Sequence, residues 1–188
     1  MGTLKEDIKL QSDWIVKAFA ADGFKLDYTI DSIIEVDRFF TKNMKNGQPR
    51  KGGRLYGKGF GPILFSIGSY VGETIINNVK DSEWITNDND PQGELNVSLK
   101  MPNDGEIWPI QKVIKRFQNG SEDSIYPYVH MVTKEFTNLP FKEEFWTLTA
   151  EIDEPEQTKP WWKFWQFFHS PEVLPTKLHN NKEIPNKI

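Results

Sequence analysis

The chain has 188 residues, a formal net charge of −4 and no cysteine, with 37% hydrophobic and 27% charged residues. These values are typical of one globular domain with an extension, and they exclude disulfide bonds, thiolate catalysis and cysteine-ligated zinc. Because the balance of charge is not basic, we expect no nucleic-acid partner.

Two amphipathic helices are predicted in the first quarter of the chain. The first runs from about Ser12 to Ala21 and ends at the Asp-Gly pair that follows. An extended piece over residues 24–30 leads to the second helix, residues 32–44. Asp37 borders the apolar face of this second helix, where a carboxylate needs a cation or a backbone N–H group as its partner.

A glycine-rich basic loop follows, over residues 46–61, NGQPRKGGRLYGKGFG, and it includes Arg54. Part of it matches G-x-x-x-x-G-K. However, Gly59 stands where a phosphate-binding loop needs Ser or Thr to hold magnesium, and no apolar strand precedes the loop. We therefore expect no nucleotide hydrolysis. A solvated loop is the favoured interpretation, and weak anion binding before a helix N-terminus is the alternative.

The central element is predicted over residues 62–79, PILFSIGSYVGETIINNV, because apolar residues cover most of this helix's circumference. Gly68 and Gly72 share one face and would let a neighbouring element approach closely. Each glycine costs about 0.5–1 kcal/mol relative to alanine in a helix interior, so close packing is the expected compensation. Glu73 falls on a narrow polar stripe of the same helix.

A small antiparallel sheet of about three to four strands is predicted after the central helix. Its strands are residues 82–86, 94–101 and 106–109, and a fourth strand is predicted over residues 144–152. In the second strand the alternation of apolar and polar residues points one set of side chains inward, namely Leu95, Val97, Leu99 and Met101.

Two further helices complete the predicted domain. One spans residues 109–118, with a proline at its start and Asn-Gly at its end, and Arg116 borders its core face. The other begins at Ser124, its expected N-cap, and extends to about Phe136. The whole pattern predicts a single α+β domain over residues 1–153, in which helices cover one face of the sheet.

The end of the chain has a different composition. Residues 154–160 read as a linker, and residues 161–188 as an aromatic segment followed by a disordered polar tail. Aromatic side chains bury roughly 150–250 Å² each, so this segment should not stay in water. It could cover the domain's own surface, another protein or a membrane interface. The aromatic residues are Trp161, Trp162, Phe164, Trp165, Phe167 and Phe168.

Several short motifs follow one another along the chain: SIIEVDRFF, IGSYVGETI, a tryptophan strand, and LNVSLKMPNDGEIWPIQKVIKRFQNG. Together they resemble a family of bacterial domains of unknown function with a GxYLGE helix, in which Val71 here replaces the usual leucine. The resemblance covers about residues 25–135 and implies an α+β fold, a bacterial source and no established activity. It carries over Asp37, Gly68, Tyr70, Gly72, Glu73, Trp84, Trp108, Pro109 and Arg116, and it names none of them as catalytic.

The leading functional hypothesis is a non-enzymatic interaction protein, regulatory or immunity-like, whose partner is another protein. His130, His169 and His179 lack ligand spacing and there is no nucleophile elbow, so we predict no metal and no cofactor. The chain starts without an apolar export signal, and no stretch reaches about 18 apolar residues, which favours a cytoplasmic protein.

Two alternatives remain open. In the first, Glu73 serves a small-ligand or enzymatic pocket together with Tyr70, Arg54 and Arg116, as an acid, a base or an anchor for a cation. A structural ion pair between Asp37 and Arg116 is the simpler interpretation of those two residues. In the second, the chain attaches peripherally to a membrane through residues 161–168.

Overall fold

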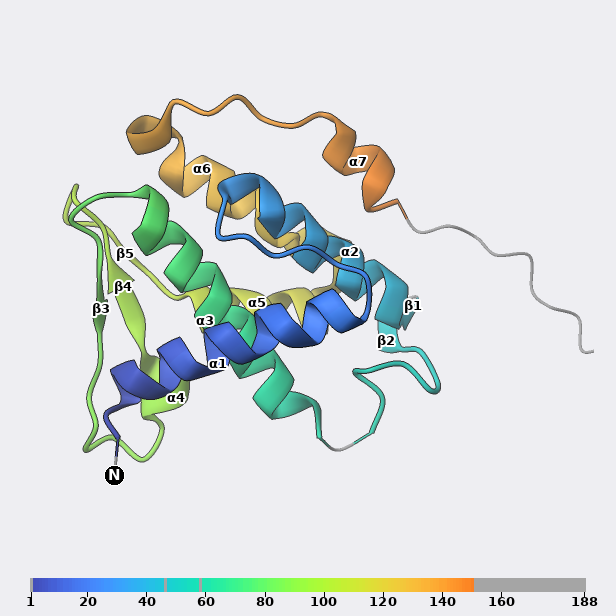
Figure 1. Ribbon diagram of the computed structural model, residues 1–188, viewed down its shortest axis with the longest axis horizontal. Coiled ribbons are helices and arrows are strands. Elements are labelled where there is room, and N and C mark those ends of the chain that lie inside the picture. The colour runs from blue at the N-terminus through green and yellow to red at the C-terminus, as the bar shows by residue number, and fades with distance from the viewer. Residues whose placement is uncertain (1, 46, 58, 151–188) are drawn as a thin grey trace, which may run out of the picture. The chain divides into compact units, whose positions relative to one another are not determined.

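The computed structural model describes residues 2–45, 47–57 and 59–150 (Figure 1). These residues form helices and two small antiparallel sheets, which confirms the predicted α+β class. The helices are α1 (Leu4–Ala21), α2 (Ile33–Asn43), α3 (Phe60–Asn78), α4 (Gly93–Asn96), α5 (Pro109–Asn119), α6 (Ile125–Thr137) and α7 (Glu144–Leu148), with 3₁₀ turns η1 (Ile30–Ser32) and η2 (Gly120–Asp123). The strands are β1 (Met44–Lys45), β2 (Gln48–Pro49), β3 (Glu83–Ile85), β4 (Ser98–Lys100) and β5 (Glu106–Ile107).

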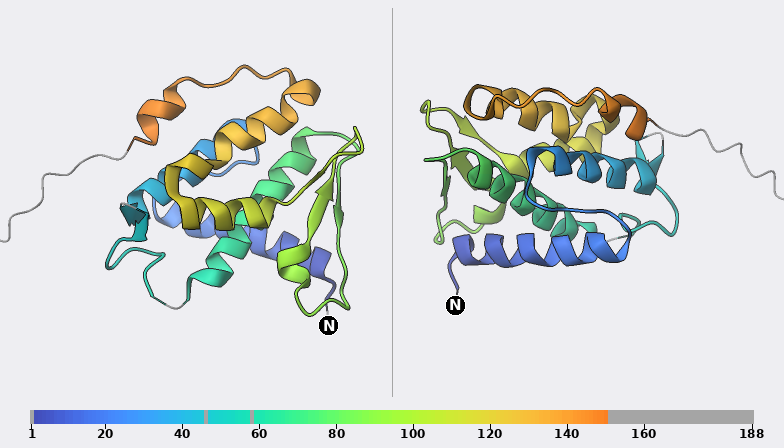
Figure 2. Two further views of the ribbon diagram at one scale, coloured as in Figure 1. Left: turned by 180° about the vertical axis from the view of Figure 1, so that it is seen from behind. Right: turned by 45° about the horizontal axis from the view of Figure 1, so that its top comes forward.

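Helix α3 is the central element, as predicted. It packs against α1 and α5, and Figure 2 shows α1 on one side of it and α6 on the other. A Cβ atom added at Gly68 would lie 2.6 Å from the Cα atom of Ile110 in α5. A Cβ atom at Gly72 would lie 2.0 Å from Cη2 of Trp84 in β3. Because Gly68 and Gly72 have no side chain, α5 and the sheet can pack closely against α3.

Helix α1 begins eight residues before the predicted start at Ser12, because a capping box forms at its N-terminus. The amide of Glu6 donates to Oγ1 of Thr3 at 3.3 Å, and the amide of Thr3 donates to Oε2 of Glu6 at 2.8 Å. These bonds satisfy two amides that a helix start would otherwise leave without partners.

The three-stranded sheet has the order β3-β4-β5 and stands at one end of the domain, opposite the β1–β2 hairpin (Figure 1). Trp84 is paired with Leu99, and Leu99 with Ile107. The hairpin β1–β2 was not predicted, since it lies at the edge of the glycine-rich loop.

The predicted inward position of Leu95 is wrong. Residues 93–96 form the short helix α4, closed by a hydrogen bond of 2.9 Å from the amide of Val97 to the carbonyl of Gly93. The chain therefore joins the sheet only at Ser98, and Leu95 stays 48% exposed.

The predicted fourth strand over residues 144–152 is also wrong, because residues 144–148 form helix α7. In a helix a single side chain, Phe145, turns inward, and it packs against Tyr126 and Phe141. The next residue, Trp146, is 58% exposed. No helix among the described residues is long and apolar enough to cross a membrane.

Candidate functional site

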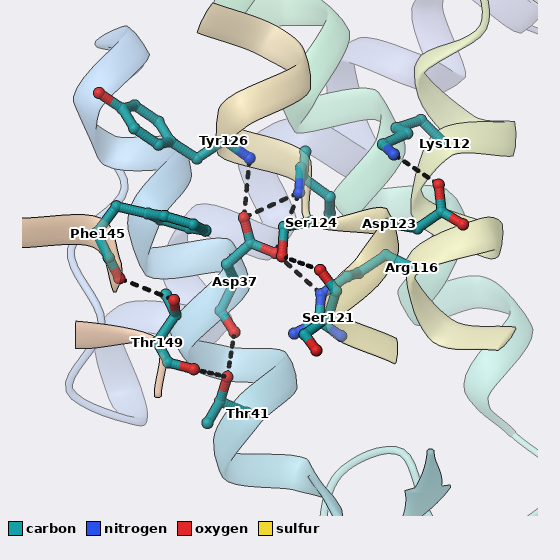
Figure 3. A network of polar contacts seen from close by, with 11 residues as sticks. Asp37, Thr41, Lys112, Arg116, Ser121, Asp123, Ser124, Tyr126, Phe145 and Thr149 are labelled. Carbon is teal, nitrogen blue, oxygen red and sulfur yellow. Dashed lines mark hydrogen bonds and ion pairs between the residues drawn. The ribbon is translucent and has the colours of Figure 1, made fainter. Parts of the chain in front are cut away.

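Asp37, like Tyr70, is a predicted site residue that is fully buried. It lies on the inner face of α2 and is inaccessible to solvent. Its carboxylate accepts hydrogen bonds from Nε of Arg116 at 3.0 Å and from the amides of Ile125 at 2.9 Å and Tyr126 at 2.8 Å (Figure 3). Burial raises the pKa of the Asp37 carboxyl, while these donors act in the opposite direction because they stabilise the carboxylate.

The expected ion pair between Asp37 and Arg116 is therefore present, and it also caps a helix. Ser124 is not the N-cap acceptor that the sequence suggested, since its hydroxyl donates to the carbonyl of Ser121 at 2.7 Å. The first amides of α6 are satisfied instead by Asp37, a residue far away in the sequence. This arrangement ties α2, α5 and α6 together, and its burial leaves no access for a substrate.

Glu73 has a structural partner. Its Oε1 atom accepts a hydrogen bond of 2.8 Å from the indole nitrogen of Trp84, the residue that packs on Gly72. Tyr70, one turn away, is fully buried, and its hydroxyl lies 2.5 Å from Oγ of Ser32 and accepts from the amide of Tyr28 at 3.0 Å. Burial raises the pKa of the Tyr70 hydroxyl.

Arg54 lies on the surface, where it forms two hydrogen bonds to Asp22, from Nε at 2.9 Å and from Nη2 at 2.7 Å. This guanidinium lowers the pKa of the Asp22 carboxyl. Glu73, Arg54 and Arg116 thus bind three different partners: a tryptophan, a surface aspartate and a buried aspartate. The structure does not bring them together around one pocket.

A hollow on the domain lies elsewhere, and the sequence did not indicate it. It is a groove of about 770 Å³ bordered by α1, α3, α4 and α5. Phe60 and Phe117 stack on each other here, with ring centroids 4.6 Å apart. The apolar residues that line the groove are Phe60, Pro62, Leu64, Phe65, Leu95, Ile110, Ile114 and Phe117.

The groove continues into a second hollow, of about 350 Å³, beside α4 and the first turn of α1. The two hollows share Asp7, Glu94 and Leu95 in their linings. The smaller hollow adds Asp88 and Asp90, so this end is acidic. Within the described ranges, no lysine, arginine or histidine lines either hollow.

The sequence does not predict the groove for an identifiable reason. The apolar positions of residues 109–118 fit a core face, and the position of Leu95 fits a strand. One feature of the sequence could have indicated the groove. Helix α5 and the start of α3 carry more apolar side chains than a single packing face needs. No pattern in the sequence shows that these faces stay uncovered.

In the part of the chain that the structure describes, no group of three or more His, Cys, Asp or Glu side chains is placed to hold a metal ion. His130 is bonded to the carbonyl of Leu139 at 3.0 Å, and its ring meets Phe141 edge-on. The aromatic segment Trp161–Phe168 lies outside the described residues.

Comparison with known proteins gives no relative for this chain: no family model, no curated protein and no solved structure matches it.

Proposed function

We propose that this chain is a non-enzymatic protein-interaction protein, and that the groove between α1, α3, α4 and α5 binds an apolar segment of a partner protein. The observation that carries this proposal is the groove itself, about 770 Å³ in volume and lined mainly by aromatic and aliphatic side chains. Apolar grooves between helices are a recurring site for the apolar face of a partner's helix or extended segment.

The polar side chains of the groove favour a protein segment over a small metabolite. Sites for small molecules place several polar groups so that they converge on the ligand. Here Oε1 of Gln11 already accepts a hydrogen bond of 2.7 Å from Ser66, and the acidic residues lie at one end. Apart from these residues and Gln118, the lining is apolar surface, whose burial stabilises a complex by roughly 25 cal/mol per Å².

The alternative in which Glu73 serves a pocket with Arg54 and Arg116 has lost its geometric support, because each of these side chains binds a different partner. On the motifs alone, we keep the proposal that the chain belongs to the bacterial family it resembles. A cytoplasmic location also stays a proposal. Trp161–Phe168 stays a proposed second contact segment, toward a protein or a membrane surface.

The test compares two exposed leucines in the full chain. Leu95→Ser removes an apolar side chain from the groove, whereas Leu148→Ser removes one of similar exposure, 46% against 48%, from α7. The ligand is the fluorescein-labelled peptide KKKWLFL, followed by fluorescence anisotropy. Because burial of a leucine contributes about 1.5–3 kcal/mol, Leu95→Ser should weaken binding about tenfold or more.

Leu148→Ser should bind this peptide as the unmodified protein does. A second variant, Gly61→Phe, adds a side chain to the groove lining at a position where no atom lies within 4 Å, so it should block the groove without disturbing the core. If both groove variants bind the peptide with unchanged affinity, the groove is not the binding surface.

A further inference from the structure

The groove and the smaller hollow share lining residues, and the lining changes from apolar to acidic from one to the other. Phe60 and Phe117 stack in the apolar groove, and the shared residues Asp7, Glu94 and Leu95 lead into the acidic hollow. Figure 1 shows α4, which carries two of these residues, beside the first turns of α1. A segment that lies along the groove and reaches this hollow would pass from apolar to anionic surroundings.

The acidic residues of this region fall into two classes. Asp88 and Asp90 have local partners: Asp88 accepts from the amide of Leu4 at 2.8 Å, and Asp90 accepts from the amide of Gln92 and the side chain of Asn96. The bond from Asn96 lowers the pKa of the Asp90 carboxyl most, so Asp90 stays anionic in neutral solution.

Asp7 and Glu94 have no such local partners. Both are exposed, and in the residues that the structure describes neither forms an ion pair or a side-chain hydrogen bond. They also lie where the groove and the acidic hollow meet. Anionic side chains at the edge of an apolar site attract cations and repel anions, so they select among ligands that fit the groove equally well.

We infer that the partner's segment is basic and amphipathic, with lysine or arginine next to its apolar anchors, and that its cationic end lies over Asp7 and Glu94. This inference rests on the proposed function, since it identifies the chemistry of the segment that the groove binds. The same two carboxylates weaken the binding of an acidic segment, because they repel its anionic side chains.

The experiment measures the affinities of three labelled peptides for the full chain at about 20 mM and about 500 mM salt. KKKWLFL carries cations and apolar anchors, EEEWLFL keeps only the anchors, and KKKSGSG keeps only the cations. At low salt KKKWLFL should bind about tenfold or more tighter than EEEWLFL. This ratio should shrink at high salt, because exposed charges are screened beyond a Debye length of roughly 3–10 Å.

The double variant Asp7→Asn/Glu94→Gln should reduce the ratio about fivefold or more, since it removes both unpaired carboxylates. The matched control Glu122→Gln/Glu144→Gln removes two exposed carboxylates outside both hollows, and it should leave the ratio unchanged. Thermal unfolding of each variant checks that the fold is retained.

The outcomes separate this inference from the proposed function. If KKKWLFL and EEEWLFL bind equally well, and Leu95→Ser weakens both, the groove binds apolar segments and the inference of a basic partner is wrong. If the Asp7→Asn/Glu94→Gln variant keeps the full ratio of KKKWLFL affinity to EEEWLFL affinity, the inference of a basic partner is also wrong. If KKKSGSG binds as tightly as KKKWLFL, or none of the peptides binds, the proposed function fails as well.

Discussion

Asp37 shows how much one residue can hold together in this protein. Its buried carboxylate accepts hydrogen bonds both from the guanidinium of Arg116 and from the first two amides of α6. A buried carboxylate without these donors would be strongly destabilising, and so would the buried guanidinium without the carboxylate. The residue therefore has a structural role, and its presence in the resembled motif does not require a catalytic one.

Replacing Asp37 by asparagine should lower the free energy of unfolding by about 3–5 kcal/mol, because it leaves Arg116 as an uncompensated buried charge. Urea unfolding followed by circular dichroism measures this change. The control is Glu35→Gln on the same helix, which breaks the more exposed pair with Arg38 and should cost less than about 1 kcal/mol. A loss below 1 kcal/mol for Asp37→Asn would contradict the structural role.

The ion pair between Lys112 and Asp123, 2.8 Å apart, makes a pH-dependent contribution (Figure 3). Hydrogen bonds from Lys112 and Asn119 lower the pKa of the Asp123 carboxyl in the folded state. A group with a lowered folded pKa adds stability above its unfolded pKa, about 3.9, and this stability is lost as the pH falls through the folded value.

Asp123→Asn should therefore destabilise the protein by roughly 0.2–1 kcal/mol at pH 7, and the difference should narrow below about pH 4. Urea midpoints of the two proteins across this pH range provide the measurement. The neighbouring variant Glu122→Gln should show no such narrowing, because this exposed side chain makes no described ion pair. A difference between Asp123→Asn and the parent that stays constant with pH would assign the effect to packing.

At the scale of elements, α3 was predicted well because the pattern that indicates it lies within the helix's own residues. Nearly continuous apolar residues with two glycines four apart require burial on several sides, and the structure places α1, α5 and Trp84 there. The start of α1 was missed for the opposite reason. Its first turns are exposed and polar, so hydrophobic periodicity says little about them, and the Thr3–Glu6 capping box was overlooked.

Gly72→Ala should destabilise the protein by about 1–3 kcal/mol, because the new methyl group would lie 2.0 Å from Cη2 of the Trp84 ring and must displace it. Differential scanning calorimetry would measure the loss of stability, and tryptophan fluorescence would report the displacement of the Trp84 ring. The matched control is Gly61→Ala on the same helix, where nothing lies within 4 Å and the higher helix propensity of alanine should be neutral or slightly stabilising. Equal behaviour of the two variants would mean that Gly72 is not a packing site.

Helices α4 and α7 show where strand prediction failed. The two predicted strands, residues 94–101 and 144–152, alternate apolar and polar residues over most of their length, yet each begins with a helix of only a few residues. A strand also needs a neighbour to satisfy its backbone. Helix α7 instead follows the connection over residues 138–143, and its Phe145 packs against Tyr126. The geometry of the neighbouring elements therefore overrides local alternation.

At the scale of the whole molecule, the buried core of the described residues is formed by side chains between Ile8 and Phe145. A chain that lacks residues 161–188 should therefore unfold cooperatively, with a midpoint within a few degrees of the full chain's, in circular dichroism melts. A clearly lower midpoint would favour the alternative in which the aromatic segment covers the domain's own surface. Loss of cooperative unfolding would contradict a self-sufficient domain.

The same truncation tests the role proposed for the aromatic segment. If Trp161–Phe168 contacts a membrane surface, the full chain should float with liposomes and the truncated chain should not. If it contacts only a protein, neither chain should float. In both cases the truncated chain should still bind KKKWLFL, because the groove is formed by α1, α3, α4 and α5.

The sequence by itself determined the class of the fold, the central helix, most helix ends and the need of Asp37 for a buried partner. These properties depend on periodicity, capping residues and the cost of burying a charge, which act over a few residues. Only the tertiary structure decided that Asp37 caps α6, that Glu73 binds Trp84 and that α3 and α5 leave an apolar groove next to Asp7 and Glu94. Those outcomes depend on which faces of distant elements meet or stay uncovered, and no local pattern specifies that.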